Sequence, residues 1–481
     1  MSIDQTSFVR PERSLYRHME WRFSFVGHGG NLHHGLRRHY HVPLLRGSRR
    51  QAAGWALVCL AAVSVAQAAD PAVSRHFDFG AGAASAGREK VSPETAYSNQ
   101  TGYGFDLGTK PSQLEWGVAS AQPFFFSVSL PEGNYRVTAG LGDSAGACVT
   151  TVKAESRRLM IERAASAAGE HKTVAFAVNI RNFKIPPPPR NAPGGDQVRL
   201  NDRERREGVL VLHWDDKLTL EFSNLRPCLD SLDIEPAPEL PTVFLAGDST
   251  VTDQPREPTA SWGQMFTRFF SPGVAIANHA ESGETLKSFI TGLRLDKILS
   301  QMKKGDYLFL QFGHNDEKAS WPQTYVEPFT THKAYLKVFI AEARRRGAIP
   351  VLVTPMQRRN FDGLKIRNTH GDFPESVRQT AREESVPLID LSAMSMAFYE
   401  ALGPEKSPLA FSGGRDATHH SDYGAYELAK CVVEGVRANK LDLARYIVED
   451  YRPFDPAHPD PPEAFDVPAS PGRSNVPPRG N

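Results

Sequence analysis

The feature that most constrains the fold is a regular alternation of apolar runs and helical segments between residues 243 and 438. The apolar runs, which we interpret as buried strands, lie at 243–246, 274–277, 307–312, 349–353 and 386–391. Segments with helical periodicity lie at 286–302, 332–346, 375–384 and 423–438. This alternation predicts an α/β domain in which helices cover both faces of a mostly parallel sheet.

The preceding region, 76–236, has a different pattern of short strands, turns and no convincing helix. Apolar residues alternate over 124–130, pause at 131–134 and resume over 135–139, which predicts a β-hairpin. A second hairpin is predicted from Val209 and Val211, through a turn at Asp215-Asp216, to 218–222. Strands at this density, joined by Gly-rich and Pro-rich loops, predict an all-β sandwich.

Four regions are therefore expected along the 481 residues: a leader at 1–68, the sandwich at 69–237, the α/β domain at 238–450 and a tail at 451–481. A Pro-containing stretch at 235–241 is the expected linker between the two domains. The tail contains nine Pro from residue 452 onward, so we expect it to have no fold of its own.

The end of the leader has the three regions of a signal peptide. Arg46, Arg49 and Arg50 precede an uncharged apolar run at 52–65, and Ala66-Gln67-Ala68 follows it. The run is too short to span a bilayer comfortably, so no stable membrane anchor is expected. A signal peptide begins near its basic region, so we also expect the true start to lie downstream of Met1. The sequence thus predicts an exported protein, either periplasmic or extracellular.

The formal charge of +1 is an average of two unlike parts. Residues 1–50 hold nine Arg and three acidic residues, a balance of +6, so the rest of the chain carries −5. A mildly acidic chain lacks the basic footprint of a nucleic-acid-binding protein, and no nucleic-acid partner is expected. Composition does not predict the oligomeric state.

Cysteine usage allows at most one disulfide outside the leader. Cys148, Cys228 and Cys431 remain, and the first two fall in the predicted sandwich. Cys148 and Cys228 are therefore the candidate pair, although sequence gives no distance between them. The alternative is that all three are small buried apolar side chains.

Three polar junctions follow predicted strands of the α/β domain. Ser249 lies in Gly-Asp-Ser-Thr after the first strand, Gly283 follows the second, and Asn315 follows the third. Ligands bind such sheets at the carboxyl ends of the strands. A Ser there can act as a nucleophile, while a Gly N–H and an Asn amide can stabilise an oxyanion. Each junction taken alone is also compatible with an ordinary helix cap or turn.

A fourth polar segment, 415–420, precedes the last predicted helix. A hydrolytic Ser needs a His as base and a carboxylate that orients the imidazole, and the three-residue spacing can bring Asp416 onto His419. The alternative, a metal site of Asp416, His419, His420 and Asp422, lacks a zinc-type spacing.

Together, in this order, these blocks resemble the GDSL or SGNH hydrolase family. The segments Phe244-Leu-Ala-Gly-Asp-Ser-Thr250, Trp262-Gly263, Phe312-Gly-His-Asn-Asp316 and Thr354-Pro-Met-Gln-Arg-Arg359 resemble its rhamnogalacturonan acetylesterase branch. The sandwich, with Phe77-Asp-Phe-Gly80 and Gly102-Tyr-Gly-Phe105, looks like the galactose-binding-like domain of bacterial members. The resemblance implies the three-layer SGNH fold.

The resemblance also implies a role for each block. Ser249 is expected to be the nucleophile, His419 the general base and then acid, and Asp416 its orienting partner. The oxyanion hole is expected to contain the N–H groups of Ser249 and Gly283 and the Asn315 amide. The implied mechanism needs no metal and no organic cofactor.

The expected substrate is an acetylated polysaccharide, with rhamnogalacturonan favoured by the resemblance. Arg358, Arg359 and Arg415 are candidates for pairing with its carboxylates, and the alternative for each is an ordinary surface ion pair. Trp262 is a candidate sugar platform or, equally, a core residue. Two other functions stay open: the same chemistry on acetylated xylan or a lipid ester, and a non-catalytic glycan-binding protein.

Overall fold

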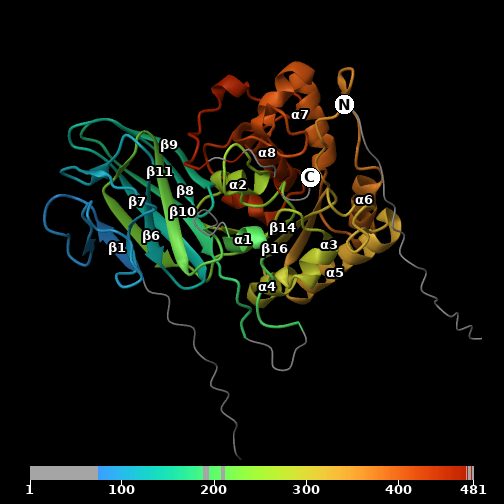
Figure 1. The fold of residues 1–481 in the computed structure, drawn as a ribbon, viewed down its shortest axis with the longest axis horizontal. Helices are drawn as coiled ribbons and strands as arrows, with labels where there is room; N and C mark the ends of the chain where they lie inside the picture. The colour runs from blue at the N-terminus through green and yellow to red at the C-terminus, as the bar shows by residue number, and fades with distance from the viewer. Residues whose placement is uncertain (1–73, 188–193, 207–211, 473, 475–477, 479–481) are drawn as a thin grey trace, which may run out of the picture. The chain divides into compact units, whose positions relative to one another are not determined.

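The structure is a computed structural model that describes residues 74–187, 194–206, 212–472, 474 and 478 (Figure 1). The predicted signal peptide lies outside these residues. Within the described part of the chain, no helix has both the length and the apolar character that a membrane crossing requires.

Two five-stranded sheets form the first domain, which confirms the predicted β-rich fold (Figure 1). The first sheet has the order β10 (His171–Ile180), β7 (Gly133–Gly142), β13 (Ser231–Pro236), β1 (Arg75–Asp78) and β2 (Glu89–Lys90). The second has the order β3 (Tyr103–Asp106), β6 (Phe124–Ser129), β11 (Lys217–Arg226), β8 (Cys148–Ala154) and β9 (Arg158–Ser166). A small sheet contains β12 (Cys228–Leu229), β5 (Val118–Ala119) and β4 (Ser112–Gln113). Apolar side chains from both large sheets form one core.

The hairpin predicted over 124–139 is wrong in its pairing. Both strands exist, but β6 pairs with β3 and β11, whereas β7 pairs with β10 and β13. The turn at 131–134 therefore carries the chain from one sheet to the other. The period of a strand identifies its buried face and does not identify its neighbour.

The second predicted hairpin is only partly covered by the structure. Its return strand is β11, while Val209 and Val211 lie outside the described residues. The short helix α1 (Asp202–Arg206) was not expected in this domain.

A disulfide joins Cys148 to Cys228, whose Cα atoms lie 6.2 Å apart. The bond links the start of β8 to β12, and both residues are buried beside Ala119. The candidate pairing is thus present in the structure, and Cys431 is buried as a free thiol.

The second domain contains the predicted parallel sheet. Its strand order is β15 (Ala275–Asn278), β14 (Thr242–Gly247), β16 (Tyr307–Gln311), β17 (Ile349–Val353) and β20 (Leu388–Ile389), and every pair is parallel. A separate two-stranded ribbon contains β18 (Phe361–Asp362) and β19 (Lys365–Ile366). The sheet is buried on both faces, which explains why its strands are continuous apolar runs.

Helices cover both faces of this sheet, so the predicted three-layer α/β fold is confirmed. On one face the core includes residues of α3 (Leu286–Thr291), α4 (Arg294–Gln301), α5 (Lys333–Arg345) and α6 (Phe373–Glu384). On the other it includes residues of α2 (Trp262–Phe266), α7 (Leu391–Lys406) and α8 (Asp422–Ala438).

Two helix predictions need correction. The single helix expected at 286–302 is two helices, because Leu293 adopts a left-handed conformation with φ of 61° between α3 and α4. The sequence interpretation also omitted α7, which begins at Leu391, where the last strand was expected to end.

The two domains and the tail pack against one another. In the predicted linker, Ala237 and Leu240 are buried with Ala275 of β15. The described part of the tail contains only a short 3₁₀ turn, Pro462–Ala464, and is otherwise irregular. It nevertheless packs on both domains, because Lys153 Nζ of β8 donates to Pro468 O at 2.6 Å, and Phe465 contacts the α/β core.

Candidate active site

Ser249 lies in a tight turn directly after β14 and is 3% exposed. The turn requires a glycine before it, because a Cβ on Gly247 would lie 2.6 Å from Val251 Cγ2 and 2.8 Å from Gln311 O. Asp248 holds the other side of the turn, since its Oδ1 accepts from Thr250 N at 2.9 Å and from Thr250 Oγ1 at 2.7 Å. The hydroxyl of Ser249 is thereby presented at the carboxyl edge of the sheet.

His419 bridges Ser249 and Asp416, although 170 residues separate it from Ser249. Its Nε2 lies 2.9 Å from Ser249 Oγ, and its Nδ1 lies 2.8 Å from Asp416 Oδ2. With Nδ1 protonated toward the carboxylate, Nε2 can accept the Ser249 proton. The structure thus brings together the three residues that the sequence nominated.

Asp416 is held as a carboxylate. Burial alone would raise its pKa, but hydrogen bonds from the His419 ring and from the backbone of His419 and Thr418 outweigh burial and lower the pKa to about 2. The two backbone bonds go to Asp416 Oδ1, at 2.7 Å from Thr418 N and 2.9 Å from His419 N. The negative charge that orients the imidazole is therefore fixed by the same turn that carries it.

The candidate oxyanion residues follow β14, β15 and β16, which are adjacent in the sheet. Gly283 has a φ of 83°, a left-handed conformation that favours glycine. Gln254 Nε2 donates to Ser249 O at 2.7 Å and lies 3.5 Å from Ser282 Oγ, so it connects the nucleophile turn to the Gly283 loop. Asn315 Nδ2 donates to Glu284 O at 3.0 Å and connects the third junction to the same loop.

Asp316 connects two of these loops through hydrogen bonds to its carboxyl group. Its Oδ1 accepts from Leu286 N at 2.9 Å and its Oδ2 from Gly313 N at 3.1 Å. Burial raises the pKa of Asp316 to about 8. The residue next to Asn315 is therefore a structural anchor for the start of α3.

His420 and Asp422 have structural contacts and do not join Ser249. His420 is buried, its Nε2 lies 2.6 Å from Tyr399 Oη, and burial lowers its pKa to about 3. Asp422 accepts from Arg157 at 2.8 Å. The contacts of His420 and Asp422 are therefore with other protein side chains, and neither side chain is hydrogen-bonded to Ser249 in the described residues.

The four predicted substrate-binding residues lie in different environments. Trp262 is 1% exposed and donates from Nε1 to Gln311 Oε1 at 2.7 Å, so it is a core residue and its sugar-platform role is wrong. Arg358 forms an ion pair with Glu317 at 2.6 Å. Arg359 lies against the His419 loop, with its guanidinium 3.3 Å from Gly414 O. Arg415 is exposed.

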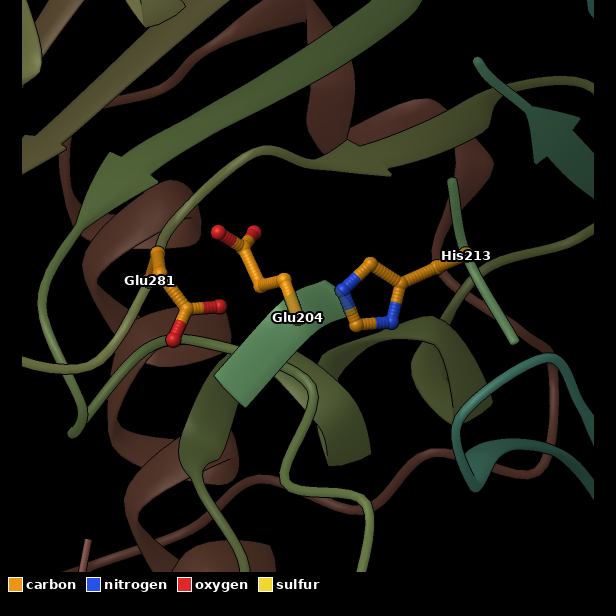
Figure 2. Close-up of side chains that lie close together, drawn as sticks. All are labelled: Glu204, His213 and Glu281. Carbon is orange, nitrogen blue, oxygen red and sulfur yellow. The ribbon is translucent and has the colours of Figure 1, made fainter. Parts of the chain in front are cut away.

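One group among the described residues offers side chains of the kinds that ligate metals: Glu204, His213 and Glu281 (Figure 2). The three buried side chains point toward one another, and their candidate ligand atoms lie within 4.8 Å of one another. The Glu204 carboxylate already accepts from Arg294 at 2.6 Å and from Trp214 Nε1 at 2.8 Å. Arg294 of the α/β domain thus pairs with Glu204 of the sandwich domain, and this ion pair is a buried polar contact between the two domains.

Several residues of the site were missed by sequence reasoning. Gln254, Glu317 and Lys318 each contact a nominated residue or its neighbour, but they are polar side chains in loops, which is where solvated residues also lie. The only sequence signal was the position of Glu317 and Lys318 directly after the Asn315 block.

The chain is similar in sequence to known esterases. The model of the GDSL-like lipase/acylhydrolase family matches residues 245–425. Rhamnogalacturonan acetylesterase RhgT of Bacillus subtilis is 42% identical over 221 residues, covering 43% of this chain and 94% of that protein. The esterase YxiM of the same organism is 27% identical over 402 residues, covering 79% of this chain and 95% of that protein. A crystal structure of YxiM aligns with a TM-score of 0.42 at 23% identity, covering 77% of this chain and 99% of that one.

The chain therefore belongs to the GDSL-like lipase/acylhydrolase family. This membership confirms the resemblance found in the sequence and the prediction of an ester hydrolase.

Proposed function

We propose that the protein is a serine esterase that removes acetyl groups from a plant cell-wall polysaccharide, with acetylated rhamnogalacturonan as the favoured substrate. The observation that carries the chemistry is the position of His419, between Ser249 Oγ at 2.9 Å and Asp416 Oδ2 at 2.8 Å. The choice of substrate is supported by the 42% identity to the rhamnogalacturonan acetylesterase RhgT.

In the first half of the reaction, Ser249 Oγ attacks the acetyl carbonyl carbon while His419 Nε2 takes the hydroxyl proton. The carbonyl oxygen becomes an oxyanion, which the N–H groups of Ser249 and Gly283 and the Asn315 amide stabilise. His419 then donates its proton to the sugar oxygen as the ester bond breaks. The deacetylated sugar leaves, and the acetyl group stays on Ser249.

In the second half, a water molecule attacks the acetyl-enzyme. His419 accepts the proton of this water, the same donors hold the second oxyanion, and acetate leaves as Ser249 Oγ recovers a proton from His419. Asp416 keeps its charge throughout, because it holds the imidazole in one tautomer and stabilises the imidazolium.

We further propose that the protein is exported and that the leader, residues 1–68, is removed after Ala68. The Cys148–Cys228 disulfide supports this, since such bonds persist in oxidising compartments. N-terminal sequencing of protein recovered outside the cytoplasm would test it, and a chain that still contains Trp21 would contradict it.

The function is tested by measuring acetate released from acetylated rhamnogalacturonan, acetylated xylan and a short-chain lipid ester at equal ester concentration. The proposal expects the highest kcat/KM on rhamnogalacturonan. Faster release from acetylated xylan or the lipid ester would support the same mechanism but contradict rhamnogalacturonan as the favoured substrate. Absence of release from all three, together with no labelling of Ser249 by a fluorophosphonate probe, would indicate a glycan-binding protein with a silent hydrolase fold.

A further inference from the structure

Lys318 contacts the oxygen end of the Asn315 side-chain amide, whereas Glu284 contacts its nitrogen end. Lys318 Nζ donates to Asn315 Oδ1 at 3.2 Å, while Asn315 Nδ2 donates to Glu284 O at 3.0 Å. The Lys318 backbone N–H also donates to Asn315 O at 3.2 Å. Both ends of the Asn315 amide are thus held by separate groups.

These two contacts fix which way the amide points. If the Asn315 amide were rotated by half a turn, its NH₂ group would face the Lys318 ammonium and its oxygen would face the Glu284 carbonyl. A donor would then face a donor at one end and an acceptor would face an acceptor at the other, which is unfavourable at both ends. Nδ2 carries two hydrogens and one is donated to Glu284 O, so this orientation leaves the second hydrogen available as a donor.

The ammonium itself is held in place. Lys318 Nζ lies 4.6 Å from the centre of the Trp321 ring, a cation–π contact. Lys318 and Trp321 are both half-buried, so the contact is partly shielded from water. The charged groups that act on Lys318 are Arg358, Asp248 and Glu317, and Arg358 is itself paired with Glu317 at 2.6 Å.

We infer that Lys318 is a positioning residue that sets the orientation of the Asn315 amide and strengthens its remaining N–H as an oxyanion donor. A positively charged donor hydrogen-bonded to Oδ1 polarises the amide and makes its N–H a better donor, an effect of hydrogen bonds in series. The inference rests on the proposed function, because it requires Asn315 to stabilise the oxyanion formed by attack of Ser249.

The test uses a double-mutant cycle on a small neutral ester, p-nitrophenyl acetate, so that no substrate charge can bind Lys318 directly. Lys318→Met is expected to lower kcat by about 10-fold, a part of the 10²–10³-fold loss typical of deleting one oxyanion donor, with KM within about 2-fold of wild type. In an Asn315→Ala background, the same substitution is expected to change kcat by less than about 2-fold, since its only route of action is already gone.

Lys337→Met is the matched control, because Lys337 is an ion-paired lysine on α5 that this inference does not involve. It should leave kcat unchanged. Lys318→Gln, which keeps a polar donor without the charge, should show an intermediate kcat and provides a second variant if Lys318→Met folds poorly by circular dichroism.

An equal loss of kcat from Lys318→Met with and without Asn315, or a change confined to KM, would overturn the inference. So would a Lys318→Met enzyme with wild-type kcat whose activity still depends on Ser249, and in that case the proposed function would stand. If instead Ser249→Ala retained full activity, the proposed function would fail first and this inference with it.

Discussion

Arg158 of the β-sandwich forms a buried ion pair with Asp253, four residues after Ser249, with 2.7 Å between Arg158 Nε and Asp253 Oδ2. The exposed fractions of these side chains are 1% and 0%. Asp253 Oδ1 in turn accepts from Asn278 Nδ2, at the end of β15, at 2.8 Å. The first domain is thereby connected directly to the loops that surround the candidate nucleophile.

We therefore expect Arg158→Met to destabilise the protein, because it leaves the Asp253 carboxylate buried without its main partner. The expected loss in the free energy of unfolding is about 3–5 kcal/mol, measured by urea denaturation. Arg136→Met, which removes the exposed pair with Glu239, is the control and should cost less than about 1 kcal/mol. Equal unfolding midpoints for the two variants would contradict the structural role of the buried pair.

The disulfide should contribute substantially to the stability of the sandwich. Cys148 and Cys228 are 80 residues apart in the sequence, so the bond closes a long loop in the unfolded chain. Replacing both with Ala is expected to lower the free energy of unfolding by about 2–5 kcal/mol. Cys431→Ala, a substitution of the buried free thiol outside the sandwich, should leave the effect of a reducing agent on Tm unchanged, whereas the double variant should abolish it.

The charge of Asp416 should make stability depend on pH in the acid range. The pKa of Asp416 is lowered from 3.8 to about 2, so its contribution is fully present above pH 4 and is lost as pH falls toward 2. Asp416→Asn should therefore cost about 2 kcal/mol at pH 6 and almost nothing at pH 2. Urea denaturation of both proteins across this range measures the difference, and a difference that stays constant with pH would argue against a stabilised carboxylate.

Removal of the Asn315 side chain should affect turnover more than folding. Asn315→Ala is expected to lower kcat for acetate release by about 10²–10³-fold, since one oxyanion donor is lost. Its Tm should stay close to that of wild type, because the residue contributes only two side-chain hydrogen bonds to the fold. A large fall in Tm with an unchanged kcat would assign Asn315 to structure alone.

The sequence predicted the site better than it predicted the partners of the strands. Ser249, Gly283 and Asn315 could be located because parallel strands deliver their carboxyl ends to one edge of the sheet. The period of β6 and β7 was equally clear, yet their pairing was wrong, because pairing depends on contacts between distant segments and not on the period of either strand.

Residues that act through long-range contacts had no signal in the sequence. Trp262 was a candidate sugar platform because an aromatic residue near a polar block can be either buried or exposed. In the structure it packs against Phe266 and is buried. Gln254 was missed for the same reason, because the Ser249 turn and the loop of Ser282 that it connects become neighbours only in the folded domain. Lys318 is only three residues from Asn315, and its position after that block did not distinguish it from a solvated loop residue.

The most direct test of the central claim is acetate release from acetylated rhamnogalacturonan by the Ser249→Ala variant. The variant should show the circular dichroism spectrum and Tm of wild type and should lose at least about 10³-fold in kcat, because neither acetyl transfer to Ser249 nor proton transfer to His419 can occur. A folded Ser249→Ala protein that releases acetate at the wild-type rate would contradict the account.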